Sequence, residues 1–276
     1  MPPAGTGLAG TGLAGTGLAG TGLAGVVLAA GFGRRLRPLT DLRPKALCPV
    51  GGVPLLDHAL ARLAPHADDL AVNAHHHADQ MITHVGARAH LSVEAAEPLG
   101  TAGALGRLRS WLDGRDVLLT NADAYLAGSL DDLVSGFDGA RCRLLVREVT
   151  APGDFSAGGR PVRYVGACVL PGALVGRLAP TPSGLYEVLW RDLDAQGLLD
   201  LVVTPSVVID CGTPADYLAA NLHASGGASV VGAGALVEGR LERCVVWDGA
   251  YVGRDERLVH VVRAGDRDRP VTVGAA

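Results

Sequence analysis

The chain has 276 residues, of which 48% are hydrophobic and 19% charged, a composition typical of a globular protein and not of a disordered one. Its length is sufficient for one large domain or two modest ones. A formal net charge of −4 gives no general reason to expect nucleic-acid binding, so any cationic site must be local. The five cysteines lack Cys-x-x-Cys spacing, so the sequence predicts neither a disulfide framework nor a zinc site. We expect buried thiols in a protein of the reducing cytoplasm.

Residues 6–25 repeat the unit Thr-Gly-Leu-Ala-Gly four times, and the first charged side chain in the sequence is Arg34. The chain start, Met-Pro-Pro, lacks the cations of a signal peptide. Two glycines in every repeat of five residues also disfavour a membrane helix. We therefore interpret residues 1–24 as a low-complexity extension, assign it no function and expect no membrane partner.

A phosphate-binding loop is predicted directly after this extension. Residues 26–30 are apolar, which predicts a strand buried on both faces. Gly31 and Gly33 follow, and glycines at the exit of a strand leave main-chain N–H groups free to hold an anion. Arg35 and Lys45, the only lysine of the chain, would then neutralise that anion.

Strand and helix patterns alternate through the following part of the chain, which predicts an α/β fold with a mostly parallel sheet. Strands are expected at residues 69–74, 91–95, 116–123, 141–149, 162–170 and 207–210. Helices are expected at residues 55–63, after residue 104 through Trp111, at residues 183–196 and from residue 214. The three consecutive histidines at residues 75–77 would point in different directions on any regular element. We therefore expect them in a loop or at a helix start, and not in a metal site.

Four motifs occur in a fixed order along this pattern. They are Leu-Ala-Ala-Gly-x-Gly-x-Arg-Leu-x-Pro-Leu-Thr with Pro-Lys (residues 28–45), Leu-Gly-Thr-Ala-Gly (99–103), Asn-x-Asp (121–123), and Asp-x-Gly-Thr-Pro-x-x-Tyr-Leu-x-x-Asn (210–221). Together they resemble the signature of the sugar-1-phosphate nucleotidyltransferases, the NDP-sugar pyrophosphorylases, over about residues 25–262. The resemblance implies a doubly wound α/β nucleotidyltransferase core, which we assign to residues 25–225.

The resemblance also implies a reaction between an NTP and a sugar 1-phosphate that yields an NDP-sugar and pyrophosphate. Arg35 would hold the departing pyrophosphate, Lys45 would stabilise charge near the α-phosphate, and Asp123 and Asp210 would bind Mg²⁺. A lone Asp after a strand is otherwise more often a cap or turn residue. The residues implied to line the nucleotide are Leu28, Ala30, Gly31, Gly33, Gly100, Thr101 and Gly103.

Sugar binding is implied for Gly166 and Glu187, although an exposed helical Glu is an almost equal interpretation of Glu187. Two features depart from the family pattern. Arg34 stands where relatives have a small residue or Thr, and the second lysine that many relatives place against the sugar phosphate is absent. Arg160 or Arg163 is a candidate to replace that lysine.

The base and the sugar have several candidates. The Leu-Gly-Thr-Ala-Gly motif and the C-terminal pattern favour synthesis of the GDP-mannose type, whereas Gly153-Asp154-Phe155 resembles uridylyltransferases that act on N-acetylmuramic acid 1-phosphate. UDP- or dTDP-sugar synthesis is therefore the alternative. A non-catalytic nucleotide-sugar sensor is another class, disfavoured because such members typically lose loop or carboxylate residues that this chain retains.

A different pattern begins near residue 228. Val231 and Val237 lie six residues apart, as do Val246, Val252 and Leu258. Apolar hexads punctuated by glycine predict a short left-handed β-helix of the hexapeptide type at residues 226–276. Two hypotheses stand for this tail: it forms a homodimer, or it packs against its own subunit.

Overall fold

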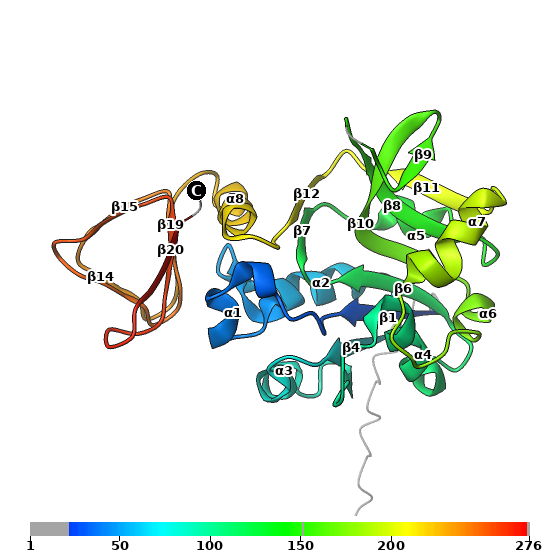
Figure 1. Ribbon diagram of the computed structural model, residues 1–276, viewed down its shortest axis with the longest axis horizontal. Coiled ribbons are helices and arrows are strands. Elements are labelled where there is room, and N and C mark those ends of the chain that lie inside the picture. The colour runs from blue at the N-terminus through cyan, green and yellow to red at the C-terminus, as the bar shows by residue number, and fades with distance from the viewer. Residues whose placement is uncertain (1–21, 151, 275–276) are drawn as a thin grey trace, which may run out of the picture.

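The computed structural model describes residues 22–150 and 152–274. An eight-stranded sheet forms the core (Figure 1). Its strands are β1 (Leu23–Leu28), β4 (Asp69–Ala74), β5 (His90–Val93), β6 (Asp116–Asn121), β8 (Cys142–Glu148), β9 (Phe155–Ala157), β10 (Arg160–Leu170) and β11 (Leu199–Val203). The order is β11-β8-β10-β6-β1-β4-β5, with β9 attached to β10. Only β10 runs antiparallel to its neighbours on this path, which confirms a mostly parallel α/β core.

Helices cover both faces of the sheet. The helices on one face are α2 (Leu55–Leu63), α3 (Ala78–Val85) and α5 (Asp131–Ser135); those on the other are α4 (Gly100–Leu112), α6 (Gly172–Val175), a π-helical turn (Tyr186–Trp190) and α7 (Arg191–Ala195). In β1, Val27 packs into the first core and Val26 into the second, and neither is exposed. Successive side chains of a strand point to opposite faces of the sheet, so a strand covered by helices on both faces needs a continuous apolar run.

The first strand begins and ends earlier than the sequence predicts. Leu23 and Ala24, which belong to the last repeat of the extension, are buried in β1 and pair with β6. The strand ends at Leu28 because the next main-chain N–H, that of Ala29, donates to the side chain of Asn73 at 2.6 Å. Residues 1–21, which hold the rest of the repeats, lie outside the described part of the chain.

Most predicted elements are confirmed, but the strand that ends at Asp210 is placed differently. It is β12 (Val207–Asp210), which pairs with β7 (Ala124–Ala127) in a separate antiparallel pair. The apolar run before Asp210 predicts a buried strand, and this prediction is wrong because Val207 is 43% exposed. An apolar run without alternation does not reveal whether its strand joins the main sheet or a two-stranded pair beside it.

Short elements shape the segment after β1. They are a 3-10 turn (Arg34–Leu36), α1 (Leu39–Leu42), a second 3-10 turn (Lys45–Leu47), β2 (Pro49–Val50) and β3 (Val53–Pro54). Further along, α8 (Pro214–Ala224) starts where expected, with the Thr213 hydroxyl accepting the N–H of Asp216 as an N-cap. No helix within residues 22–150 and 152–274 is long and apolar enough to cross a membrane.

The C-terminal strands stack as parallel coils with a triangular outline (Figure 1). The parallel strands are β13 (Val230–Val231), β14 (Leu236–Val237), β15 (Arg240–Glu242), β16 (Val245–Val246), β17 (Tyr251–Val252), β18 (Arg257–Val259) and β19 (Val261–Ala264), and β20 (Val271–Gly274) follows them. Val246, Val252 and Leu258 are buried between coils as the hexads predict, whereas Val231 is 49% exposed. The left hand of the coils stays a prediction. The last strand, β20, pairs antiparallel with β19 and covers its edge.

The coils pack against their own subunit. Trp247 is buried and donates its indole N–H to the Tyr217 hydroxyl at 3.0 Å, and that hydroxyl donates to the carbonyl of Pro49. The guanidinium of Arg43 lies 4.3 Å from the centre of the Trp247 ring. The tail, α8 and the segment that carries Lys45 thus share one hydrophobic core. Homodimerisation stays an untested hypothesis.

Candidate active site

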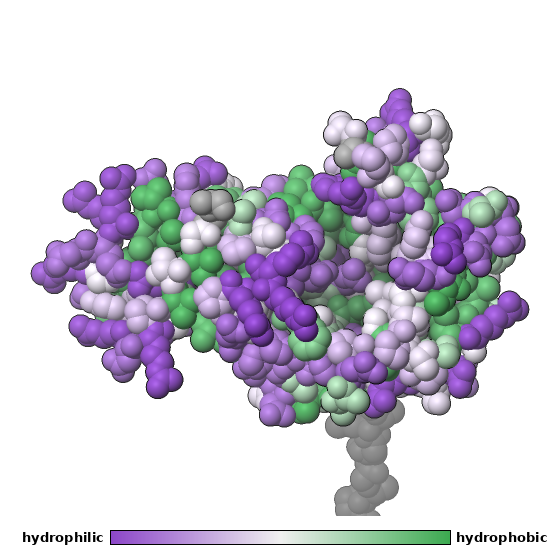
Figure 2. All heavy atoms as spheres, in the orientation of Figure 1, coloured by the Kyte–Doolittle hydropathy of each residue, from purple (hydrophilic) through white to green (hydrophobic). Residues whose placement is uncertain are grey.

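A cavity of about 380 Å³ opens where β1, β4 and β6 end. Figure 2 shows a hollow in this face, with hydrophilic side chains gathered at its edge. The residues that line it are Leu28, Ala29, Ala30, Gly31, Gly33, Arg34, Arg35, Lys45, Ala46, Asn73, Pro98, Gly100, Thr101, Asn121, Ala122, Asp123 and Gly212. Open α/β sheets bind ligands at the carboxyl ends of their strands, which is where this cavity lies.

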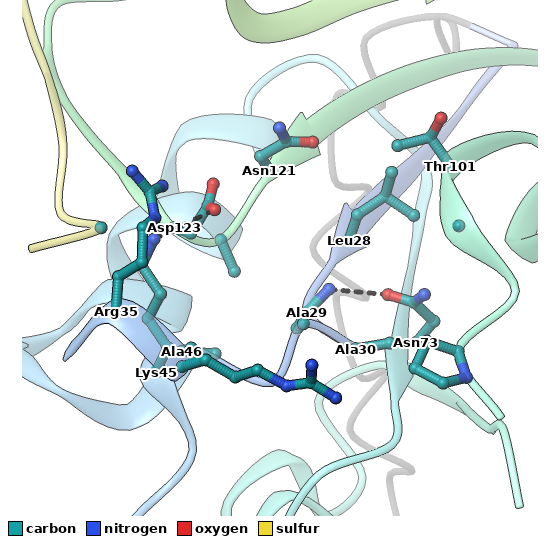
Figure 3. A pocket seen from close by; sticks show the side chains of 17 residues that line it. Leu28, Ala29, Ala30, Arg35, Lys45, Ala46, Asn73, Thr101, Asn121 and Asp123 are labelled. Carbon is teal, nitrogen blue, oxygen red and sulfur yellow. Dashed lines mark hydrogen bonds and ion pairs between the residues drawn. The ribbon is translucent and has the colours of Figure 1, made fainter. Parts of the chain in front are cut away.

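One side of the cavity is an ion cluster. The Lys45 Nζ lies 3.1 Å from Asp123 Oδ2 and 3.2 Å from Asp210 Oδ1, and the Arg35 guanidinium lies 3.3 Å from Asp210 Oδ2. The side chain of Lys45 is only 9% exposed, whereas those of the two carboxylates are 49% and 59% exposed. In Figure 3, Arg35, Lys45 and Asp123 lie on the same side of the cavity. The four residues predicted to be catalytic are therefore brought together.

Local backbone geometry positions this cluster. Gly33 has a φ of 62°, and a Cβ there would lie 2.8 Å from Thr40 Cγ2 and 3.1 Å from Lys45 Cβ. The Thr40 hydroxyl donates to the Gly33 carbonyl at 3.0 Å and closes the loop. Asp210 reaches the site because the N–H of the next residue, Cys211, donates to the Asp123 carbonyl at 3.0 Å. The glycine loop and β12 are thus anchored on either side of Lys45.

The opposite side of the cavity is a chain of neutral and acidic hydrogen-bonding groups. Asn73 Oδ1 accepts from the Ala29 N–H at 2.6 Å, and Asn73 Nδ2 donates to Glu94 Oε1 at 2.8 Å. The second carboxylate oxygen of Glu94 accepts from the Leu99 N–H at 2.7 Å. Asn73 and Glu94 are each 3% exposed. This chain holds the first motif, at Ala29, against the second motif, at Leu99.

Asn73 and Glu94 are functional-site residues that the sequence analysis missed. Each ends or follows an apolar strand, in Asp-Leu-Ala-Val-Asn-Ala (69–74) and Leu-Ser-Val-Glu-Ala-Ala (91–96). A polar side chain at the carboxyl end of a buried parallel strand was the available signal. Within the described ranges Glu94 forms no ion pair, so its charge is met by the two N–H donors.

The second motif divides between cavity and packing. Gly100 and Thr101 line the cavity, and the Thr101 hydroxyl accepts from the Leu185 N–H at 2.8 Å. Gly103 does not line the cavity. It lies against another segment instead, where a Cβ would be 2.3 Å from the carbonyl oxygen of Thr181. The close approach of α4 to the segment at Thr181 thus explains Gly103, and its predicted nucleotide contact finds no support.

The two residues predicted to bind sugar lie outside the cavity lining. Gly166 has a φ of 87°, and a Cβ there would lie 3.2 Å from Asn121, which does line the cavity. Glu187 is exposed on the π-helical turn. Gly166 therefore backs the cavity wall, whereas Glu187 matches the interpretation of an exposed helical residue.

The candidates for the missing second lysine also lie outside the lining. Arg160 pairs with Glu148 at 2.9 Å, and Arg163 donates to the Pro152 carbonyl at 3.1 Å. In the same hairpin, a Cβ at Gly153 would lie 2.3 Å from the Val162 carbonyl oxygen. Gly153 therefore permits close contact of the hairpin strands.

The thiols beside the ion cluster are chemically quiet. All five cysteines are buried and unpaired with one another, as expected. Burial is the main cause that raises the pKa of Cys48 and of Cys211 to about 12. Because the thiolate is the reactive form, these groups stay neutral near pH 7 and are no candidates for nucleophilic catalysis.

A comparison with known families decides the kind of protein. Residues 25–175, more than half of the chain, match the family model of the MobA-like NTP transferase domain. The chain belongs to this family of NTP transferases. Its glycine loop, its Asn73–Glu94 chain and all members of its ion cluster except Asp210 lie within the matched residues.

Relatives of this NTP transferase carry the names of sugar-1-phosphate nucleotidyltransferases, which confirms the resemblance drawn from the motifs. The N-acetylmuramate α-1-phosphate uridylyltransferase of Caulobacter vibrioides is 29% identical over 229 residues, covering 70% of this chain and 93% of that protein. A probable mannose-1-phosphate guanylyltransferase of Arabidopsis thaliana is 25% identical over 228 residues, covering 70% of this chain and 62% of that protein.

Solved structures share the fold of the NTP transferase at low identity. A Bacillus anthracis protein crystallised with a sucrose has a TM-score of 0.64 at 19% identity, covering 73% of this chain and 95% of that one. HddC from Yersinia pseudotuberculosis, complexed with GMP-PN, has a TM-score of 0.60 at 19% identity, covering 73% and 99%. These likenesses support the architecture of the core.

Proposed function

We propose that this NTP transferase moves a nucleotidyl group from an NTP to a sugar 1-phosphate and releases pyrophosphate. The observation that carries the proposal is the meeting of Lys45 and Arg35 with Asp123 and Asp210 at the rim of a glycine-lined cavity. Anionic substrates need cations there, and the names of the relatives support the same class of reaction.

In the proposed reaction an oxygen of the sugar phosphate attacks the α-phosphorus of the NTP, and the bond to the β-phosphate oxygen breaks. The protein's contribution is positioning and charge stabilisation, not covalent catalysis. The Lys45 ammonium lies between two carboxylates and lines the cavity, where it would stabilise negative charge on the α-phosphate. Arg35, at the exposed end of the cluster, would hold the pyrophosphate as it leaves.

Asp123 and Asp210 fit a divalent cation. Both carboxylates reach one ammonium within 3.2 Å, so they are close enough to share an ion. Among the described residues no group of three or more His, Cys, Asp or Glu side chains could hold an ion alone, so further ligands would be phosphate oxygens and water. Mg²⁺, when bound, would supply neutralising charge to those phosphate oxygens.

For the base, we propose uridine first and guanosine second. The match to the Caulobacter uridylyltransferase spans 93% of that protein, which favours uridylyl transfer to an N-acetylmuramate-type sugar phosphate. The GDP-mannose type, favoured by the second motif, has the support of the Arabidopsis relative, of which the chain spans 62%. The Gly153-Asp154-Phe155 segment adds little to the choice, because its contacts serve the hairpin.

The test is a matrix of five NTPs against several sugar 1-phosphates, including those of N-acetylmuramate, mannose and glucose. Pyrophosphate release is measured with Mg²⁺ and with a chelator. We expect release for one dominant pair, highest with UTP, and loss of release with the chelator. Tight nucleotide binding without release from any pair would contradict the proposal and favour a sensor.

A further inference from the structure

Arg34 is a cation of the cavity without an acidic partner. It lines the cavity, yet no ion pair joins it to any residue in the described part of the chain. The two other cations of the lining, Arg35 and Lys45, are each held by carboxylates within 3.3 Å. The contact found for Arg34 is with a ring: its guanidinium lies 4.8 Å from the centre of Phe32. Its charge therefore remains uncompensated.

Phe32 shows on which side of the loop Arg34 lies. The Phe32 ring meets His75 edge-on, with the ring centres 5.1 Å apart, and His75 directly follows β4. Arg35 extends instead to Asp210 at the end of β12. The two adjacent arginines thus extend in different directions from one loop. Arg34 lies over Phe32, whose ring meets His75 after β4, whereas Arg35 extends to the carboxylate of Asp210.

We infer that Arg34 binds the β- and γ-phosphates of the NTP, as a second guanidinium beside Arg35. The inference rests on the proposed function. Arg35 is proposed to hold the departing pyrophosphate, and Arg34 is the adjacent cation of the same loop, which lines the cavity without a carboxylate partner among the described residues, so the β- and γ-phosphates are the anion it would meet. A guanidinium forms paired, charge-assisted hydrogen bonds with phosphate oxygens, and its stacking on Phe32 keeps it extended before the nucleotide arrives.

The test compares Arg34→Gln and Arg34→Lys with wild type in calorimetric titrations with UTP, UMP and inorganic pyrophosphate, and with GTP and GMP where these bind more tightly. Arg37→Gln is the matched control, because Arg37 lies in the same loop but pairs with Asp41 at 3.0 Å and does not line the cavity. Arg34 is exposed, so we expect all variants to melt within about 2 °C of wild type.

Arg34→Gln should weaken the binding of UTP and of pyrophosphate by about tenfold and leave UMP binding within about twofold, since only one charge-assisted contact is lost. The affinity of Arg34→Lys for UTP and pyrophosphate should lie between those of wild type and Arg34→Gln, because an ammonium keeps the charge but cannot form paired hydrogen bonds as a guanidinium does. Arg37→Gln should match wild type.

Equal weakening of UTP and UMP, no weakening of UTP, or a raised KM for the sugar 1-phosphate alone would each overturn the inference. If wild type transfers nucleotide normally and Arg34→Gln binds UTP as well as wild type does, the inference fails while the proposed function stands. If wild type binds no NTP at all, the proposed function itself fails.

Discussion

The two sides of the cavity are built on different physics. The charged wall, defined as Arg35, Lys45, Asp123 and Asp210, consists of ion pairs whose carboxylates are about half exposed. Ion pairs so open to water contribute little to stability, because solvent screens them and ordering long side chains costs entropy. The cations of the charged wall can therefore leave their carboxylate partners and bind anionic substrates.

The neutral wall, defined as Ala29, Asn73, Glu94 and Leu99, is joined by hydrogen bonds of 2.6 to 2.8 Å. The side chains of Asn73 and Glu94 are buried, and Ala29 and Leu99 are half-buried. Removing one partner of a buried hydrogen bond leaves the other unsatisfied, which costs more than the bond contributes. The neutral wall is therefore expected to fix the backbone of both nucleotide motifs and to carry stability. The comparison indicates a division within one cavity: the charged wall would act on the substrates, and the neutral wall would stabilise the fold around them.

The largest effect is expected from Lys45→Met on the charged wall. Turnover should fall by about 10²- to 10³-fold, because the buried cation proposed to stabilise charge at the α-phosphate is lost while the volume of the side chain is approximately kept. The free energy of unfolding should change by less than about 1 kcal/mol, since the two carboxylates left behind are open to water. Pyrophosphate release and urea unfolding are the measurements.

Arg62→Gln is no suitable control for Lys45, because the half-buried Arg62 donates to the Leu126 carbonyl. Arg257→Gln instead removes an exposed tail cation that pairs with Glu242. Arg257→Gln should leave turnover unchanged. Near wild-type turnover of Lys45→Met, or a collapse of its stability, would break the proposed division between the two walls.

A smaller effect of the opposite kind is expected from Glu94→Gln on the neutral wall. The amide can still accept one hydrogen bond through its oxygen, but its NH₂ group would face the N–H donor of Asn73 or of Leu99. The unfolding free energy should fall by about 2 kcal/mol. Urea unfolding measures this loss, and initial rates should show a raised KM for the NTP with a smaller change in kcat.

The matched control for Glu94 is Glu97→Gln, which makes the same chemical change at an exposed position three residues away. Its unfolding free energy should stay within about 0.5 kcal/mol of wild type. Equal unfolding free energies of the two variants would show that the hydrogen bonds of Glu94 do not stabilise the fold.

The smallest effect concerns the buried thiols behind the charged wall. Burial raises the pKa of Cys48, Cys142 and Cys211 from 9.0 to about 12 in the folded protein. Above pH 9 the unfolded chain releases these protons and the folded chain keeps them, so stability falls as the pH rises from 9 toward 12. At about pH 10 each thiol should lower the unfolding free energy by roughly 1.4 kcal/mol.

Urea unfolding of wild type and Cys211→Ala at about pH 8 and about pH 10 measures this effect. Cys211→Ala should lose less stability between the two pH values, by roughly the share of one thiol. Parallel losses in the two proteins would contradict the raised pKa of Cys211.

Local patterns sufficed to predict much of the fold and part of the site. The bounds of α2 and β4 follow from an amphipathic period after Pro54 and from an apolar run ending in Asn73. The error arose where the environment of an element matters more than its own residues, because the strand before Asp210 is apolar but lies off the main sheet. The contact of Gly103 with the segment at Thr181 likewise depends on tertiary packing that its motif does not reveal.

The sequence by itself determined the alternation of strands and helices, the glycine loop and the identity of the charged residues, because periodicity, turn chemistry and charge are properties of neighbouring residues. Only the tertiary structure decided which of these residues meet. Lys45 reaches Asp123 and Asp210 across 78 and 165 positions of the chain, and Ala29 reaches Asn73 across 44. Contacts over such separations depend on strand order and register, which are set by the packing of the whole core and not by any local stretch.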